Sequence, residues 1–560
     1  MTQHEPLSPS AHQDTFTRDH LPPRQSWPTF EFTVPEVQYP ARLNAATELV
    51  TRASAEFGSH RPALHAPGLP SWSYGELLHR SNQIAQVLSE DLEVVAGNRV
   101  MLRAPNNQWL VACWLSVLKV GAVVVTTSPA LRAGEVGQLI DLTSPSVLIC
   151  DHRFTGDLPT ESGALSEAEA ALPRILVFGG TDSDDLIARC ELKSGEFTDV
   201  DTAADDVALL GPTSGSTGVP KITMHFHRDV LANADTFARY LLKPVPQDIF
   251  GGSPPLAFTF GLGGLVVFPL RFGASTLLTE KAAPVELAQL CHDAGVTVLF
   301  TAPTAYRAIV KQGKVELLAG LRIGVSAGEH LGADVWQQVF DATGVRLVDG
   351  IGATEMLHVF VSAAGDDIRP GSTGRAVPGY RIAVLDADGA PAGVGVPGRL
   401  AAIGPTGCRY LSGDRQAEYV QQGWNITGDV FEVDADGYLT FHARSDSMIV
   451  SSGYNIGAPE VEDAIQKHPA VLEAAVVALP DPERGSVVCA FVVLTPGVEP
   501  SAATRKDIQD FVKQQIAPYK YPREVRFIAE LPRNPSGKLQ HFRLRDELAG
   551  DPPASERTCP

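Results

Sequence analysis

Residues 213–221 read Thr-Ser-Gly-Ser-Thr-Gly-Val-Pro-Lys, and this segment is the strongest indication of how the chain folds. Its glycines allow backbone N–H groups to approach an anion closely, and its hydroxyls and ammonium group add donors for phosphate oxygens. An apolar run over residues 207–210 precedes the segment and is typical of a strand. We therefore predict a triphosphate-binding loop at the end of a strand.

The loop differs from the Walker A loop, which ends in Gly-Lys-Ser/Thr and leads directly into a helix. Here Pro220 precedes Lys221, and residues 222–226 alternate in polarity like a second strand. A helix is expected only afterwards, with Asp229 as its N-cap. The loop is thus predicted to join two strands. Read alone, the segment could also be an ordinary Ser/Gly-rich turn.

The composition is that of a large, acidic globular protein. The chain has 560 residues, of which 44% are hydrophobic, so it can build a large core. Length alone suggests roughly three to four domain-sized units. The formal net charge of −20 favours solubility and disfavours a nucleic acid or an anionic membrane as partner.

The cysteines and the hydropathy pattern indicate a cytoplasmic protein without a membrane span. Seven cysteines are widely spread and form no Cys-x-x-Cys pair, which is typical of reduced thiols. The N-terminus is polar and has no apolar signal core. The most apolar stretch, Trp109 to Val125, is interrupted by polar residues and glycine, which predicts a buried helix followed by a strand.

The order of predicted elements favours an α/β fold. From about residue 45 to 445, helical stretches alternate with short apolar strands, which predicts layered α/β sheets. Glycine-rich residues 370–445 predict a β-rich subdomain. We therefore expect a large N-terminal domain over residues 1–444, a small α+β C-terminal domain over residues 445–548, and a disordered tail over residues 549–560.

Further segments join the loop in a fixed order. Residues 349–356 read Asp-Gly-Ile-Gly-Ala-Thr-Glu-Met, and residues 427–430 read Thr-Gly-Asp-Val. Residues 443–456 read Ala-Arg-Ser-Asp-Ser-Met-Ile-Val-Ser-Ser-Gly-Tyr-Asn-Ile, and residues 532–539 read Pro-Arg-Asn-Pro-Ser-Gly-Lys-Leu. With the loop, they make the chain resemble, over nearly its whole length, the adenylate-forming superfamily of acyl- and aryl-CoA synthetases, peptide-synthetase adenylation domains and luciferases.

Within that superfamily the chain is most similar to aryl-CoA ligases of the benzoate type. This resemblance rests on Phe258-Thr-Phe-Gly-Leu-Gly263 and on Ser326-Ala-Gly-Glu-His330. Residues 14–24, Asp-Thr-Phe-Thr-Arg-Asp-His-Leu-Pro-Pro-Arg, resemble the 2-aminobenzoate (anthranilate)–CoA ligases.

The resemblance implies a reaction in two halves. A carboxylate attacks the α-phosphate of ATP to give an acyl-adenylate and pyrophosphate, and coenzyme A then displaces AMP. Because two anions meet in the first half, catalysis must neutralise charge and align the reactants. The implied phosphate-binding residues are Thr213, Ser214, Gly215, Ser216, Thr217, Gly218 and Lys221.

Two neighbouring residues are implied to complete the phosphate site. Thr354 would contact the α-phosphate, and Glu355 would hold Mg²⁺, a hard cation that suits carboxylate oxygens. Taken alone, this dipeptide would read as an ordinary helix start.

The adenosine part of ATP is implied to bind along two segments and two ionic residues. The predicted adenine slot consists of Ser326, Ala327, Gly328, Asp349, Gly350, Ile351 and Gly352. Ile351 stands where many relatives carry an aromatic residue, so adenine is expected to rest on an aliphatic surface. Asp429 would accept hydrogen bonds from the ribose hydroxyls, with Arg444 supporting the ribose or the phosphate.

The C-terminal domain is implied to be mobile. Lys538 would be the catalytic cation of the first half-reaction, although alone it would read as an exposed tail lysine. Asp446 resembles the family hinge, and rotation there would present Gly453 and Tyr454 near the pantetheine channel. His541 stands where relatives often have arginine, which would weaken a supporting salt bridge.

The acyl pocket is the last implied site. Its candidate residues are Phe258, Phe260, Gly261, Tyr306, Gly328 and Gly352. A flat apolar slot of this kind fits an aromatic ring, although ordinary core packing also explains the phenylalanines.

The sequence thus predicts an ATP-dependent aryl-CoA ligase that acts on 2-aminobenzoate or benzoate. Its partners would be the aryl acid, ATP with Mg²⁺, and coenzyme A. A homodimer is one option for the oligomeric state. The alternatives are an adenylation enzyme that loads a separate carrier protein and a nucleotide-binding protein without turnover.

Overall fold

The computed structural model describes residues 6–159, 172–213, 220–411, 415–444, 448–451, 454–481, 485–516, 520–533 and 539–549. The chain divides into two compact units, residues 1–382 with 401–426 and residues 383–400 with 427–560. The predicted α/β class is confirmed, with parallel sheets in the large first unit and a smaller α+β arrangement near the C-terminus. The predicted domain limits at residues 444 and 548 remain predictions, and the tail beyond Ala549 lies outside the described residues.

The first unit contains a six-stranded sheet that carries the loop quoted above. Its strand order is β6 (Arg174–Phe178), β5 (Val147–Asp151), β3 (Arg99–Arg103), β4 (Val123–Thr127), β7 (Val207–Thr213) and β8 (Lys221–Phe226). All neighbours are parallel except β7 and β8. Strands β3, β4 and β5 are buried at every residue, as expected for parallel strands covered on both faces.

Helices cover this sheet and include the predicted apolar segment. Helices α4 (Gln108–Lys119) and α5 (Ala133–Thr143) pack on its strands, and α3 (Tyr74–Gln86) packs on α4. Ser73 and Glu76 form a capping box at the start of α3. The stretch Trp109 to Val125 folds as α4 followed by β4, so the predicted buried helix and strand are confirmed.

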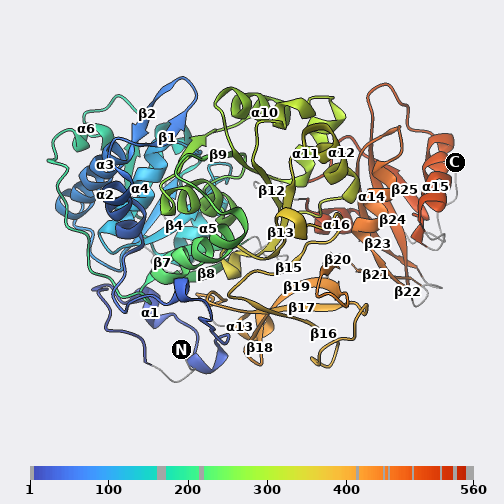
Figure 1. Ribbon diagram of the computed structural model, residues 1–560, viewed down its shortest axis with the longest axis horizontal. Coiled ribbons are helices and arrows are strands. Elements are labelled where there is room, and N and C mark those ends of the chain that lie inside the picture. The colour runs from blue at the N-terminus through green and yellow to red at the C-terminus, as the bar shows by residue number, and fades with distance from the viewer. Residues whose placement is uncertain are drawn as a thin grey trace. The chain divides into compact units, whose positions relative to one another are not determined.

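A nine-stranded sheet forms the other half of the first unit (Figure 1). Its order is β15 (Arg375–Ala376), β14 (Val359–Ser362), β13 (Leu347–Gly352), β12 (Ile323–Ala327), β11 (Val298–Thr301), β9 (Ile249–Gly252), β10 (Ser275–Leu278), β1 (Pro62–Ala66) and β2 (Leu69–Ser73). Helices α10 (Pro284–Asp293), α11 (Pro303–Lys311) and α12 (Ala333–Thr343) lie together beside it and share one apolar core with its strands.

The helix after β8 begins earlier than predicted. Helix α7 (His227–Asn233) has Phe226 at its N-cap, and a π-helical segment continues it over Ala234–Leu242. Asp229 is the third helical residue, where its Oδ2 accepts a hydrogen bond from the Phe226 N–H at 2.9 Å. The prediction of Asp229 as N-cap is therefore wrong, because a carboxylate three residues into a helix can bond back to the N-cap backbone.

The division between the units passes through a five-stranded sheet. It contains β16 (Arg381–Leu385), β17 (Gly398–Ile403), β18 (Val420–Gln421), β19 (Trp424–Val433) and β20 (Leu439–Arg444). The remaining short helices of the N-terminal region are α1 (Phe16–Asp19), α2 (Ala53–Phe57), α6 (Leu186–Cys190), α8 (Thr259–Leu262), α9 (Phe268–Arg271) and α13 (Gln416–Tyr419).

The C-terminal part of the second unit is a compact α+β arrangement. It contains the hairpin β21 (Met448–Ser451) and β22 (Tyr454–Gly457), and the sheet β23 (Val471–Asp481), β24 (Gly485–Leu494) and β25 (Glu524–Phe527). Helices α14 (Ala458–Gln466), α15 (Ala502–Gln515) and α16 (His541–Ala549) accompany these strands. Helices α14 and α15 pack their apolar residues against β23, β24 and β25 in one core.

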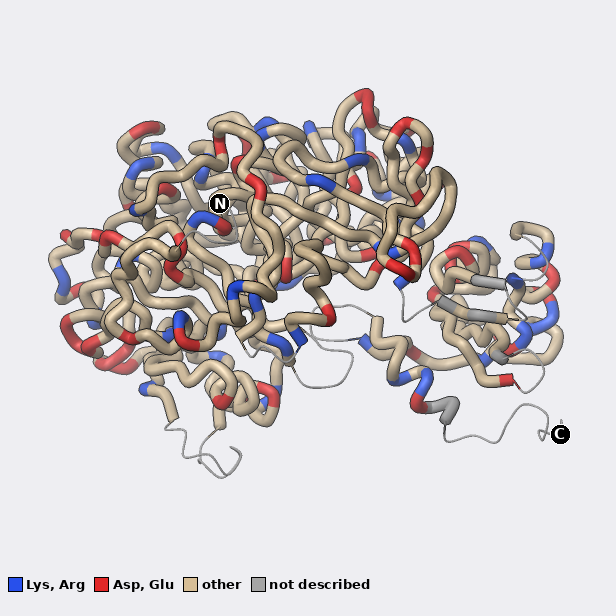
Figure 2. The backbone as a smooth tube through the Cα atoms, turned by 90° about the horizontal axis from the view of Figure 1, so that it is seen from below, with Lys and Arg blue, Asp and Glu red and all other residues tan. Residues whose placement is uncertain are grey.

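Charge and cysteine placement follow the composition. In the described part of the chain, Lys and Arg are interspersed with Asp and Glu along the backbone (Figure 2). The six cysteines in the described ranges are free and buried. None of the described helices combines the length and the apolar character that crossing a bilayer requires.

Candidate active site

The β7–β8 hairpin brings the two ends of the candidate phosphate loop together. Thr213 is the last residue of β7 and pairs with Lys221, the first residue of β8. The prediction that the loop joins two strands is therefore confirmed. The loop residues Ser214, Gly215, Ser216, Thr217 and Gly218 lie outside the described residues.

Thr354 and Glu355 lie beside this hairpin. They begin a short 3-10 helix, Thr354–Met356, that follows strand β13. A Cβ atom on Gly211 of β7 would lie only 3.1 Å from Thr354 Cγ2. The helix therefore packs directly on the strand that leads into the loop, and the structure brings together the predicted residues Thr213, Lys221, Thr354 and Glu355.

Tyr410 connects these residues, and the sequence interpretation missed it. Its hydroxyl donates a hydrogen bond to Glu355 Oε1 at 2.6 Å. The Lys221 Nζ atom lies 5.5 Å from the centroid of the Tyr410 ring. Tyr410 belongs to no short sequence pattern with a known mechanism, so only the tertiary structure could reveal it.

The candidate adenine residues occupy two neighbouring parallel strands. Ser326 pairs with Asp349, and Ala327 pairs with Gly350, at the carboxyl ends of β12 and β13. Gly328 follows with φ +91°, a conformation that favours glycine, and a Cβ there would meet no atom within 4 Å. Open space beyond strand ends is where ligands bind in α/β sheets.

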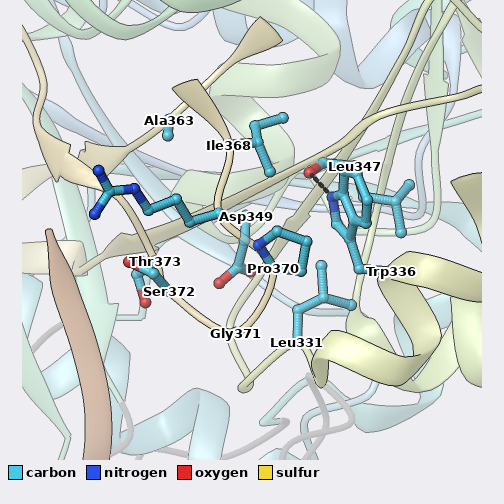
Figure 3. Close-up of a pocket in the computed structure, with 11 residues that line it drawn as sticks. Leu331, Trp336, Leu347, Asp349, Ala363, Ile368, Pro370, Gly371, Ser372 and Thr373 are labelled. Carbon is cyan, nitrogen blue, oxygen red and sulfur yellow. Dashed lines mark hydrogen bonds between the residues drawn. The ribbon is translucent and has the colours of Figure 1, made fainter. Parts of the chain in front are cut away.

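Asp349 is the acidic residue among the adenine candidates, and it lies in the wall of a pocket (Figure 3). It lines a pocket with Leu331, Trp336, Leu347 and the segment Ile368–Thr373. Burial raises the pKa of Asp349 to about 8. The residue as a whole keeps partial exposure, but its Oδ1 atom is buried and has no hydrogen-bond partner. A neutral carboxyl group in the wall of a pocket can both donate and accept hydrogen bonds, which suits a polar ligand.

Ile351 and Gly352 complete the strand. Ile351 is partly buried, as expected for an aliphatic surface, and pairs with Val361 of β14. Gly352 leaves no room for a side chain, because its Cβ would lie 2.7 Å from the His358 carbonyl oxygen. The glycine here is required by close backbone packing.

The candidate acyl-pocket residues lie on and around helix α8. Phe258 is its N-cap, and Gly261 packs so closely that a Cβ would lie 2.3 Å from the Pro255 carbonyl oxygen. The Phe260 ring lies 5.4 Å from that of Phe300 and 5.6 Å from that of His358, centroid to centroid. These three rings form part of an aromatic cluster.

His358 was not predicted from the sequence. It is 3% exposed, and burial lowers its pKa to about 3, so it is neutral. It lies among the rings of Phe237, Phe260 and Phe268. The position follows the predicted Thr354-Glu355 pair in sequence, but its burial depends on distant phenylalanines.

Tyr306 differs from the other pocket candidates. It is fully buried, and its hydroxyl donates to the carbonyl oxygens of Leu299 and Val325 at 3.2 and 3.3 Å. These bonds link α11 to strands β11 and β12. Its hydroxyl is thus already paired, and a role in the acyl pocket stays a prediction.

Within the second unit, the two candidate ribose residues form an ion pair. Asp429 of β19 pairs in register with Arg444 of β20. The Arg444 Nη1 atom lies 2.9 Å from Asp429 Oδ1, and the Asp429 side chain is 8% exposed. Arg444 therefore orients the Asp429 carboxylate.

The residues implied in hinge motion and thioester formation are only partly described. Lys538, Asp446 and Gly453 lie outside the described residues, and Tyr454 begins β22. Downstream of Lys538, His541 Nε2 lies 3.0 Å from Glu462 Oε1. The histidine ring at this position is therefore within hydrogen-bond distance of a carboxylate.

Comparisons with known proteins agree with this arrangement. Residues 50–409 match the family of AMP-binding enzymes, and residues 460–538 match the C-terminal domain of AMP-binding enzymes. The benzoate–CoA ligase of Thauera aromatica is 33% identical, over 92% of this chain and 98% of the relative. The mitochondrial acyl-coenzyme A synthetase ACSM3 of Mus musculus is 32% identical, over 85% of this chain and 84% of the relative.

A solved structure extends the likeness to three dimensions. The anthranilate CoA ligase AuaEII in complex with anthranoyl-AMP superposes with a TM-score of 0.85 at 30% identity, covering 92% of this chain and 99% of that one. The two family matches lie in the same order along the chain as the motifs: the phosphate loop falls in the first match and Lys538 in the second. The chain is therefore an enzyme of the AMP-binding family, and its resemblance to the acid–thiol ligases that form acyl- and aryl-CoA is confirmed.

Proposed function

We propose that this enzyme joins an aromatic carboxylate of the benzoate or 2-aminobenzoate type to coenzyme A through an acyl-adenylate, releasing AMP and pyrophosphate. The observation that carries the proposal is the cluster in which Tyr410 contacts both Glu355 and Lys221, the residue at which the Gly/Ser-rich loop ends. A carboxylate and an ammonium group at such a loop suit the metal and the phosphates of ATP. The benzoate ligase and the anthranoyl-AMP complex support an aromatic substrate.

In the first half-reaction, the substrate carboxylate and the α-phosphate repel each other, so the residues must supply positive charge. Lys221 and Thr213 are proposed to hold the β- and γ-phosphates, and Thr354 to donate to the α-phosphate. Mg²⁺ bound at Glu355 would supply further neutralisation as a hard cation. Lys538 is proposed as the cation that stabilises the charge shifting from carboxylate to phosphate.

The adenosine part of ATP is proposed to bind through two acidic side chains. Asp349, neutral below about pH 8, would exchange hydrogen bonds with the edge of adenine through its carboxyl group. Asp429, oriented by Arg444, would accept hydrogen bonds from the ribose hydroxyls. Ile351 would provide the aliphatic surface under the base.

The preference for an aromatic acid is proposed to come from the ring cluster around Phe260. Phe300 and the neutral His358 flank that ring, which favours a flat, apolar partner. Phe258 is proposed to separate this pocket from the coenzyme A channel.

For the second half-reaction, Asp446 is proposed as the pivot that brings Gly453 and Tyr454 to the pantetheine arm. Glycine would leave room for a thin thiol chain. The buried free thiols support a reducing, cytoplasmic setting, and a homodimer remains a proposal for the assembly.

A substrate panel tests the proposal. ATP–pyrophosphate exchange and thioester formation would be measured with benzoate, 2-aminobenzoate, hydroxybenzoates and medium-chain fatty acids. We expect kcat/KM to be highest for an aromatic acid, with thioester formed from coenzyme A. A higher kcat/KM for fatty acids would contradict the aromatic assignment. Exchange without any thioester product would instead indicate a carrier protein as acceptor.

A further inference from the structure

The Tyr410 hydroxyl is fixed as a hydrogen-bond donor to Glu355. The distance to Glu355 Oε1 is 2.6 Å, in the range of a charge-assisted bond. Burial and the nearby Glu355 carboxylate raise the pKa of Tyr410 well above its ordinary value. A phenol carries one O–H donor and a carboxylate can only accept, so Tyr410 is the donor in this bond.

The ring of the same tyrosine faces Lys221. The Lys221 Nζ atom lies 5.5 Å from the ring centroid, within the range of a cation–π contact. Tyr410 thus touches both the candidate metal ligand and the candidate phosphate-binding cation. A single side chain links two groups that are 134 positions apart in the sequence, from Lys221 to Glu355.

The backbone around Tyr410 is held firmly beside β8. The Met224 N–H donates to the Arg409 carbonyl at 2.7 Å, and the Leu411 N–H donates to the Ile222 carbonyl at 2.9 Å. Tyr410 itself forms an antiparallel bridge with Thr223. Segment 408–411 therefore continues the sheet at the strand that begins with Lys221.

The side chain of Gln416 also holds this segment in place. The Gln416 Oε1 atom accepts a hydrogen bond from the Tyr410 N–H at 3.0 Å, and Gln416 Nε2 donates to the Cys408 carbonyl at 2.9 Å. Tyr410 is only 2% exposed. Its hydroxyl therefore has one well-defined position relative to Glu355.

We propose that Tyr410 is a positioning residue that orients the Glu355 carboxylate toward the magnesium ion of Mg·ATP. The inference rests on the proposed function, which assigns the metal to Glu355. The hydroxyl takes up one lone pair of Oε1, and a carboxylate has about four such sites, so capacity for a cation remains. Groups that orient a metal ligand in this way typically change metal affinity about 10- to 100-fold when removed.

Tyr410→Phe tests the proposal because it removes one oxygen and keeps the ring beside Lys221. Pyrophosphate exchange at saturating ATP and aryl acid would be followed as free Mg²⁺ is varied, and Mg·ATP binding would be measured by calorimetry. We expect the Mg²⁺ requirement and the Kd for Mg·ATP to rise about 10-fold or more, while kcat at saturating Mg²⁺ changes little.

Tyr240→Phe is the matched control. The Tyr240 hydroxyl also donates to a carboxylate, Glu36 Oε2, at 2.7 Å. Its loss removes the same type of bond away from the candidate site. We expect Mg·ATP binding by this variant to equal that of the wild type.

Glu355→Gln separates an effect through the carboxylate from a general loss of structure. If Tyr410 acts through Glu355, adding Tyr410→Phe to the Glu355→Gln variant should raise the Kd for Mg·ATP by less than about 2-fold. An unchanged Kd for Mg·ATP in Tyr410→Phe, or an equal loss in both backgrounds, would overturn the proposal. Absence of adenylate from every acid would instead refute the proposed function, since calorimetry with Mg·ATP needs no acyl substrate.

Discussion

The buried ion pair between Arg409 and Asp229 provides a strong test of the structure. Both side chains are fully buried and in direct contact. The Arg409 guanidinium also lies 3.9 Å from the ring centroid of Phe226, 4.9 Å from that of Phe30 and 5.6 Å from that of Trp27. Arg409→Met keeps the length of the side chain and removes its charge, so Asp229 is left buried with only Arg228, whose Nε lies 3.9 Å from Asp229 Oδ1, as a counter-ion.

The expected loss of stability follows from removing the closer of the two cations beside this buried carboxylate. Removing one partner of a buried ion pair costs about 3–5 kcal/mol. The unfolding entropy is about 2.1 cal/mol/K per residue, so each kcal/mol lowers Tm by about 1 °C in a unit of roughly 400 residues. We therefore expect Arg409→Met to lower the Tm of the first unit by about 4–6 °C.

Differential scanning calorimetry checks this expectation with two companion variants. Adding Asp229→Asn to Arg409→Met removes the buried charge but keeps an acceptor for the Phe226 N–H, so most of the loss should be recovered. Arg381→Met is the exposed control, because Arg381 pairs with Glu31 while 51% exposed, and should cost less than about 1 kcal/mol. A double variant no more stable than Arg409→Met would refute the reasoning.

Three further predictions concern the candidate site. Because its folded pKa of about 8 lies above the ordinary 3.8, Asp349 destabilises the fold increasingly as pH rises from about 4 to about 8. In melts from pH 4 to 9, Asp349→Asn should therefore gain Tm relative to the wild type, and parallel curves would contradict the assignment. Gly261→Ala should lower the free energy of unfolding by about 1–3 kcal/mol and raise KM for the aryl acid, because a Cβ there meets the backbone. Gly134→Ala is the control: its Cβ meets open space, so the free energy of unfolding should be unchanged or higher and KM unchanged. Lys221→Met should slow pyrophosphate exchange about 10²–10³-fold with little change in Tm, and a rate near that of the wild type would exclude Lys221 from phosphate binding.

Local sequence patterns were sufficient for the features that depend on neighbouring residues. The short apolar runs gave parallel strands because buried strands carry few polar residues, and the alternation after Lys221 identified β8. The pairing of Asp429 with Arg444 agrees with two motifs that lie on adjacent antiparallel strands. Patterns of this kind report backbone conformation and burial directly.

Features that depend on distant contacts were beyond such patterns. Tyr410 reaches Glu355 only because segment 408–411 joins the edge of β8, and no spacing in the sequence encodes that contact. The burial of His358 depends on Phe237 and Phe268, more than 80 positions away. The start of α7 was misplaced because Asp229 can cap from inside the helix as well as from its edge.

The aromatic cage of Arg409 has a consequence for how this family is recombined. Trp27 and Phe30 stand ahead of residue 50, where the family match begins. In the same N-terminal segment, the Ala11 N–H donates a hydrogen bond to the Asp206 carboxylate at 2.9 Å. A chimera that carries only residues 50–409 of this chain would keep Arg409 and Phe226 but lose the Trp27 and Phe30 rings, so the crossover point belongs upstream of Trp27.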